Sequence, residues 1–214
     1  VLFLDGAAVL VAQQVLQQHL HRIGQLGVSL ETETIYADLA NVSEELFFIP
    51  VLREAQQAAK AIGQLFEAAL ADGRMSQQDL FSEKYTPVPN TNPQKYHTPY
   101  DGFTDTHLPA IQEPILARHA NILYAGAVDR KGYFPTHNKK YSQPLTGKYE
   151  IDLVHNRGKR IFSDRTGQRS GSNSQSLLLQ TYKRDTGEIL HDLSVPIMVN
   201  GRHWGGFRIG FKRE

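Results

Sequence analysis

Residues 176–214 read SLLLQTYKRDTGEILHDLSVPIMVNGRHWGGFRIGFKRE, and this stretch decides the fold. Three apolar-rich runs are separated by two turn signals, Asp185-Thr186-Gly187 and Asn200-Gly201. Asn-Gly between alternating runs is the strongest short-range hairpin signal, because both residues tolerate the positive φ of a two-residue turn. The pattern therefore predicts an antiparallel meander over residues 177–184, 189–199 and 202–212.

The Asn-Gly turn also predicts the register of the last two strands. If Val199 lies opposite Arg202, then Asp192 lies opposite Ile209, and side chains alternate between the two faces. One face then carries a group of polar side chains at its centre and apolar side chains at its ends: Gln180, Tyr182, Asp192 and Ser194, flanked by Phe207, Ile209 and Phe211. The same register places Arg208 on the opposite face.

This polar group has two interpretations, because buried polar side chains need hydrogen-bond partners. Either the side chains bond to one another on a face partly open to water, or a small polar ligand supplies the missing partners in a pocket. The sequence is compatible with both.

The composition argues against several classes of function. The chain has 214 residues, enough for one domain or two small ones, and a formal net charge of +1, which gives no bulk attraction to nucleic acid or an acidic membrane. It contains no cysteine, so disulfides and thiolate metal sites are excluded. Its nine histidines form no HxxxH or HExxH pair, and we predict no metal site. No run of 18 apolar residues occurs.

The first 119 residues are expected to be mainly helical. Residues 1–30 carry a heptad-like apolar stripe, typical of a helix packed on its own domain or of a dimerising helix. Further helices are predicted over 31–48, 50–71 and 102–119, and a proline-rich linker over 85–101. The chain starts at Val1 rather than Met, so we expect a fragment of a longer protein.

Residues 120–214 are expected to form a second, α/β region. A strand is predicted at 122–128 and a helix at about 150–164, before the meander. The predicted helix carries Arg157, Lys159 and Arg160, which form either a solvated face or an anion clamp. The fold class is therefore α+β: a helical stalk followed by an antiparallel sheet with helices on one face.

Several blocks of the sequence resemble one family. They are AVDRKGYFPTHN (127–138), NRGKRIFSDRTG (156–167), LLLQTYKRDTGEILHDLSVPI (177–197) and GRHWGGFRIGF (201–211), and upstream LFSEKYTPVPNTNPQKYHTPYDGFTD (80–105) and LPAIQEPIL (108–116). These blocks are similar to the sensor module of bacterial methyl-accepting chemotaxis proteins, which belongs to the PAS-like, Cache-type group. The resemblance covers residue 31 to the end.

The resemblance implies signal input. Such a module binds a small molecule or senses redox state, and it biases a helical receptor dimer that controls a histidine kinase. The family's amino-acid-binding motif is not recognisable here, so an amino-acid ligand is not carried over. The lack of cysteine excludes a covalently attached haem. We predict no cofactor, and a non-covalent haem or redox sensor is an alternative.

The candidate ligand-binding residues come from the sheet, the loop at 133–138 and the predicted helix at 150–164. In a PAS-like sheet the ligand lies between one face and the segments that cover it. The predicted site residues are Tyr133, His137, Asn138, Arg157, Arg160, Gln180, Tyr182 and Asp192. This mixture suits a small polar metabolite with an amine for Asp192 and an anionic group for an arginine.

The sequence offers two other classes of function. A catalytic set of Ser194, His191 and Asp192 is disfavoured, because neighbouring strand residues point to opposite faces, so we expect no enzyme. A dimerisation module without a small-molecule ligand is the remaining alternative. We expect a soluble domain of a membrane-associated bacterial receptor, homodimeric through the first helix and without nucleic acid. The helical start favours the cytoplasmic over the periplasmic side.

Overall fold

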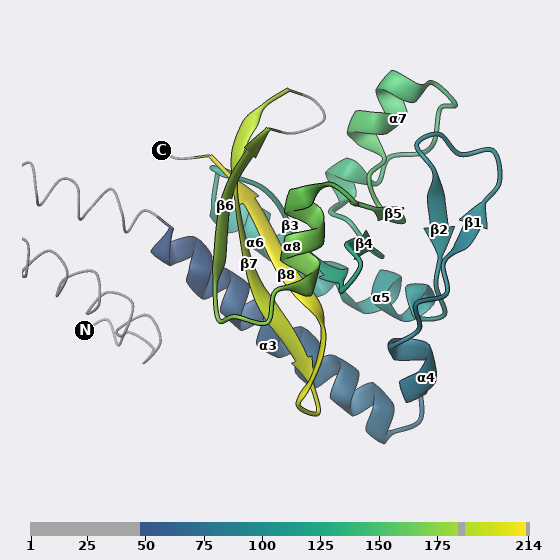
Figure 1. The fold of residues 1–214 in the computed structure, drawn as a ribbon, viewed down its shortest axis with the longest axis vertical. Coiled ribbons are helices and arrows are strands. Elements are labelled where there is room, and N and C mark those ends of the chain that lie inside the picture. Colours follow the sequence, from purple (N-terminus) through teal and green to yellow (C-terminus); the bar gives the residue numbers. More distant parts are fainter. Residues whose placement is uncertain (1–47, 184–186, 213–214) are drawn as a thin grey trace, which may run out of the picture. The chain divides into compact units, whose positions relative to one another are not determined.

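The computed structural model describes residues 48–183 and 187–212 (Figure 1). The chain divides into two compact units, residues 1–53 and 54–214, and every strand that the structure describes belongs to the second. The predicted stalk helix at 1–30 and the helix at 31–48, apart from its last residue, lie outside the described residues. None of the helices in the described ranges is both long and apolar enough to cross a bilayer.

The described elements alternate between helices and short strands before the final meander. In chain order they are α3 (Ile49–Ala71), α4 (Gln77–Leu80), β1 (Thr86–Val88), β2 (Lys95–His97), α5 (Asp101–His107), α6 (Pro109–Arg118), β3 (Ile122–Asp129), β4 (Tyr133–Phe134), η1 (Lys139–Tyr141), α7 (Tyr149–His155), β5 (Arg160–Ile161), α8 (Arg165–Ser172), β6 (Leu178–Lys183), β7 (Ile189–Val199) and β8 (Arg202–Phe211). The predicted α+β class is confirmed.

The main sheet has four antiparallel strands in the order β3-β8-β7-β6. The predicted meander is confirmed, with strand ends that differ by at most one residue. Asn200 and Gly201 have φ values of 49° and 74°, as a tight hairpin turn requires. Val199 pairs with Arg202 and Met198 with His203, as predicted.

Beyond Met198 the predicted register is wrong by one residue. Ile197 pairs with Gly205, so Trp204 is an extra residue on β8 and forms a β-bulge. The Trp204 ring is buried against Phe66 of α3, with 4.9 Å between ring centroids, and its Nε1 donates to the Leu80 carbonyl at 2.9 Å. Packing of this one large side chain therefore shifts every later residue of β8 to the opposite face from the one predicted.

The shift gives the sheet one apolar and one polar face. The apolar face carries side chains that are at most 3% exposed: Leu193, Val195, Ile197, Phe207, Ile209 and Phe211. The polar face carries Gln180, Asp192, Ser194 and Arg208. Figure 1 shows α3 behind the four strands and α8 in front of them, so helices cover both faces rather than the single face predicted.

The segments between the helices differ most from prediction. The proline-rich stretch at 85–101 contains a hairpin, β1–β2, rather than only an extended linker. The helix predicted at 150–164 is wrong in its second half: α7 ends at His155, Lys159 has a φ of 61°, and Arg160 begins β5. β5 pairs with β4, which places Arg160 opposite Phe134, whereas Arg157 lies in the loop between α7 and β5.

Candidate functional site

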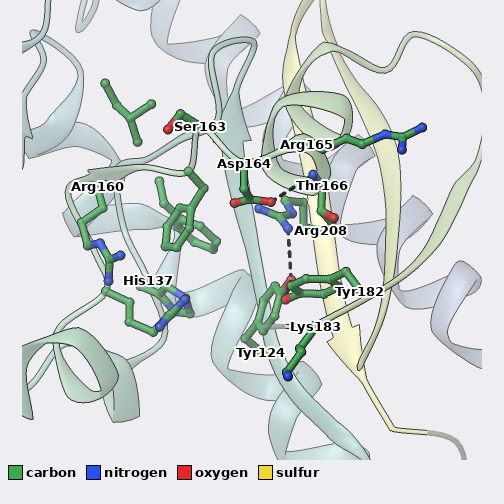
Figure 2. Close-up of a pocket in the computed structure, with 14 residues that line it drawn as sticks. Tyr124, His137, Arg160, Ser163, Asp164, Arg165, Thr166, Tyr182, Lys183 and Arg208 are labelled. Atoms are coloured by element: carbon green, nitrogen blue, oxygen red, sulfur yellow. Dashed lines mark hydrogen bonds between the residues drawn. The ribbon is translucent and has the colours of Figure 1, made fainter. Parts of the chain in front are cut away.

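A cavity of about 570 Å³ lies above the polar face of the sheet (Figure 2). Strands β3, β6 and β8 provide one wall, and the β4–β5 region and the start of α8 provide the others. The lining combines aromatic rings with basic groups: Tyr124, Phe134, His137, Arg157, Arg160, Ile161, Phe162, Ser163, Asp164, Arg165, Thr166, Tyr182, Lys183 and Arg208.

A buried ion pair underlies the cavity. The Arg208 Nη2 and Nε donate to Asp192 Oδ2 at 2.8 and 3.1 Å, and the two side chains are 5% and 0% exposed. Asp192 Oδ2 also accepts from the Tyr124 hydroxyl, and Oδ1 accepts from Ser170 Oγ of α8 at 2.7 Å. Both carboxylate oxygens therefore already accept hydrogen bonds from groups of the protein, and the side chain is fully buried.

The ion pair fixes the protonation states of this layer. Burial acts to lower the pKa of Arg208, but attraction to Asp192 together with the effects of Tyr124 and Tyr182 outweighs burial and raises that pKa above its ordinary value. Burial raises the pKa of Tyr124 well above the ordinary range of a phenol. Arg208 is therefore a permanent cation, and Tyr124 is a neutral hydroxyl donor.

One nitrogen of the Arg208 guanidinium remains available to bind a ligand. Nε and Nη2 are used by Asp192 and Tyr124, whereas Nη1 has no hydrogen-bond partner among the described residues. Arg208 lines the cavity although the whole residue is only 4% exposed. An oriented guanidinium with a free N–H edge in a recess is a ready binding group for a carboxylate or phosphate.

Two more arginines line the cavity, Arg157 in the loop before β5 and Arg160 at the start of β5. Arg157 Nη1 and Arg160 Nη1 both donate to the Leu153 carbonyl, at 3.0 and 3.2 Å. Their guanidinium carbons lie 5.2 and 5.0 Å from the centroid of the Phe162 ring, within cation–π range. Figure 2 shows Arg160 across the cavity from Arg208.

Aromatic rings form the remaining walls. The His137 ring stacks on Phe134 with 4.2 Å between centroids and an interplanar angle of 11°. Tyr124 meets both rings edge-on, at 5.8 and 6.5 Å. Figure 2 shows His137 on the same side of the cavity as Arg160. These rings would pack against the apolar part of a small organic ligand.

The charge of the lining is strongly unbalanced. It contains five basic side chains and one carboxylate, that of Asp164. Asp164 Oδ1 caps α8 by accepting from the backbone N–H groups of Thr166 and Gly167 at 3.0 and 3.1 Å. In Figure 2 the Arg165 guanidinium points away from the other basic groups. Even without Arg165, the lining favours an anion.

Half of the predicted site residues meet at this cavity. His137, Arg157, Arg160 and Tyr182 line it, with Arg160 at the start of β5 and Arg157 in the loop before it rather than in the predicted helix. Gln180 and Asp192 lie in the supporting layer: Gln180 Nε2 donates to Ser170 Oγ and to the Thr166 carbonyl of α8, at 3.1 and 3.2 Å. Because Asp192 is fully buried and bonded to Arg208, Tyr124 and Ser170, it does not reach the cavity as the predicted amine acceptor.

The other two predicted residues hold the scaffold. The Tyr133 hydroxyl donates to the Tyr96 carbonyl and contacts the Asp101 carboxylate, all within 3.0 Å. Asn138 is fully buried, and its Oδ1 accepts from the Ala125 N–H at 2.9 Å. Neither residue lines the cavity.

Two central residues of the site were missed by sequence reasoning. The predicted register has Arg208 on the wrong face because it does not include the bulge at Trp204. Tyr124 lies in the predicted strand at 122–128, but its role depends on Gly210, where an added Cβ would lie 2.0 Å from the Tyr124 ring. The absence of that side chain lets the ring cross β8 and place its hydroxyl beside Asp192 and Arg208. The glycine-rich pattern GGFRIG was the available signal.

Within the described ranges, no group of three or more histidine or acidic side chains is arranged to hold a metal ion. No family model, curated protein or solved structure matches this chain. The geometry of the cavity is therefore the main basis for a functional assignment, and the resemblance to chemotaxis sensors stays a prediction.

Proposed function

We propose that this chain is a signal-input domain that binds a small organic anion in the basic cavity. The observation that carries the proposal is Arg208: a buried guanidinium, oriented by Asp192 and Tyr124, with Nη1 left over at the cavity wall. Arg157 and Arg160 add positive charge from the facing segment, and the aromatic rings suit an organic rather than a purely inorganic anion.

The receptor context of the proposal comes from the sequence blocks. On that resemblance the domain is PAS-like and Cache-type, belongs to a bacterial chemotaxis receptor, and biases a helical homodimer that controls a histidine kinase. A ligand switches such a receptor only through its difference in affinity between two states. The cavity offers a physical source of that difference, because an anion between Arg208 and Arg160 would draw the β4–β5 segment towards the sheet.

Binding of simple anions tests the proposal. Acetate, succinate, benzoate and phosphate are screened by thermal shift and then by calorimetry on the wild-type chain. We expect at least one organic anion to raise the melting temperature. Arg160→Gln should weaken its binding about tenfold, the usual scale for one charge-assisted hydrogen bond.

Arg165→Gln is the matched control, because Arg165 is at the same cavity but points away from it. The affinity of the Arg165→Gln variant for the same organic anion should stay within about twofold of the wild-type affinity. Arg208→Lys keeps the charge but loses the two-pronged geometry, so it should also bind more weakly. Equal losses in the Arg160 and Arg165 variants, or no binding of any of the four anions, would refute the proposal.

A further inference from the structure

The segment 156–160, which carries two of the cavity arginines, is held in place by its neighbours rather than by its own secondary structure. The Lys159 carbonyl accepts from the Tyr96 N–H of β2 at 2.8 Å, and the Lys159 N–H donates to the Phe134 carbonyl at 2.8 Å. Lys159 has a φ of 61°, a left-handed conformation that is unfavourable for a residue with a side chain. External contacts therefore determine where Arg157 and Arg160 lie.

Lys95, the first residue of β2, makes the most unusual of these contacts. It is 5% exposed, and its ammonium donates to the Gly158 carbonyl and, at 3.4 Å, to the Asn156 carbonyl. These two carbonyls flank Arg157 in the chain. Lys95 forms no ion pair with a carboxylate among the described residues, although buried lysines are rare without such a pair.

The charges that act on Lys95 come from two parts of the fold. Arg160 and Lys159 approach from the held segment and Asp152 from α7. A second cavity of about 330 Å³, also lined by Asp105 and His137, adjoins Lys95. Burial, and then repulsion from Arg160, lowers the pKa of Lys95 to about 8.

We propose that Lys95 is a positioning residue whose ammonium holds Arg157 and Arg160 at the anion cavity, and that loss of its proton weakens anion binding there. Two effects act in the same direction. The neutral amine bonds the two carbonyls less strongly than the ammonium does, and the cavity loses a nearby positive charge. This inference rests on the proposed anion-binding function.

A spectroscopic experiment tests the positioning role without any ligand. The Lys95 side-chain resonances and the arginine Nε–Hε resonances are followed by NMR between pH 6.5 and 9.5. We expect the Arg157 and Arg160 signals to shift with the same midpoint as Lys95, near pH 8. These shifts should be absent in Lys95→Met and unchanged in the control Lys60→Met, which replaces an exposed lysine of α3. Arg157 and Arg160 resonances that do not shift while Lys95 titrates would overturn the proposal.

The functional arm uses benzoate, whose single charge is constant over this pH range. Its dissociation constant in wild type should rise about tenfold from pH 7 to 9.5, the effect of one lost charge contact. In Lys95→Met it should be weak and independent of pH. If Lys95→Met does not fold, the wild-type titration alone decides, and a flat profile for bound benzoate refutes the inference. If benzoate does not bind wild type, the anion function fails for this probe while the NMR arm still decides the role of Lys95.

Discussion

Asp192 of β7 and Arg208 of β8 form a buried ion pair, with 2.8 Å between Oδ2 and Nη2, although they are not directly paired across the two strands. Arg208 lies opposite Ser194, and Asp192 lies opposite Gly210. The two side chains meet diagonally on the polar face, where the Tyr124 ring occupies the space that a side chain at Gly210 would fill. Because Arg208 also lines the cavity, the ion pair contributes both to the stability of the sheet and to the orientation of a cavity cation.

The ion pair predicts a large stability loss when one partner is neutralised. Asp192→Asn leaves the Arg208 charge buried without its counter-ion, which costs about 3 kcal/mol or more. Urea denaturation measures the change. Glu188→Gln is the control, since Glu188 and its partner Lys212 are 41% and 54% exposed and the pair contributes about 0.5 kcal/mol or less. Similar losses in both variants would contradict the assignment.

The close packing of α8 on the sheet depends on Gly206. An added Cβ would lie 2.4 Å from the Ser170 carbonyl oxygen, which belongs to the helix backbone and cannot turn aside. We expect Gly206→Ala to displace α8, weaken the Ser170–Asp192 hydrogen bond and destabilise the protein by about 1–3 kcal/mol. Gly102→Ala, in α5 with open space around it, should be neutral or slightly stabilising in the same melting experiment.

The buried carboxylate of Asp129 on β3 predicts that the stability cost of removing a tyrosine hydroxyl bonded to it depends on pH. Asp129 Oδ2 accepts from the Tyr100 hydroxyl at 2.9 Å, and burial raises the pKa of Asp129 above its ordinary value. Because the folded-state pKa is raised, stability falls as pH rises from about 4 through that value. Tyr100→Phe removes a donor to the ionised form and should cost about 2 kcal/mol at pH 7 but less at pH 4.5. The half-exposed Tyr149→Phe should show no such difference between the two pH values.

The lowered pKa of Lys95 predicts that stability rises with pH, which is the opposite of the effect of Asp129. Its folded-state pKa of about 8 lies below the value of about 10.4 for an unfolded chain, so the unfolded state binds more protons between these values. The free energy of unfolding of wild type, relative to Lys95→Met, should therefore rise as pH increases from 8 to 10.5, by an amount of order 1 kcal/mol. Chemical denaturation at several pH values measures it. A constant difference between the two proteins would show that Lys95 titrates normally.

The parts of the fold with strong local signals were predictable. Asn200-Gly201 dictates its own turn, and the alternating runs around it gave the strands and the pairing of β6 with β7. The site was predictable only where this pairing determines it, as for Gln180, Tyr182 and Asp192. Arg208 was not, because its face depends on the burial of Trp204 against Phe66, a contact 138 residues distant in the chain.

The structure of the connecting segments was not predictable for a related reason. Residues 156–161 have basic and apolar residues at helical spacing, yet their backbone bonds go to Tyr96, Phe134 and Tyr141. These partners lie in segments far from 156–161 or in other elements, and tertiary contacts override a weak local preference. The hairpin at 86–97 was hidden by its prolines, which usually indicate irregular structure.

The side-chain amides that border β3 have a consequence for how this domain meets other chains. β3 is an outer strand, and the Ala125 and Ala127 N–H groups donate to Asn138 Oδ1 and Gln112 Oε1 instead of to a further strand. An incoming peptide would have to displace both amides before it could extend the sheet. This edge is therefore closed to strand addition and to the edge-to-edge aggregation that exposed outer strands promote.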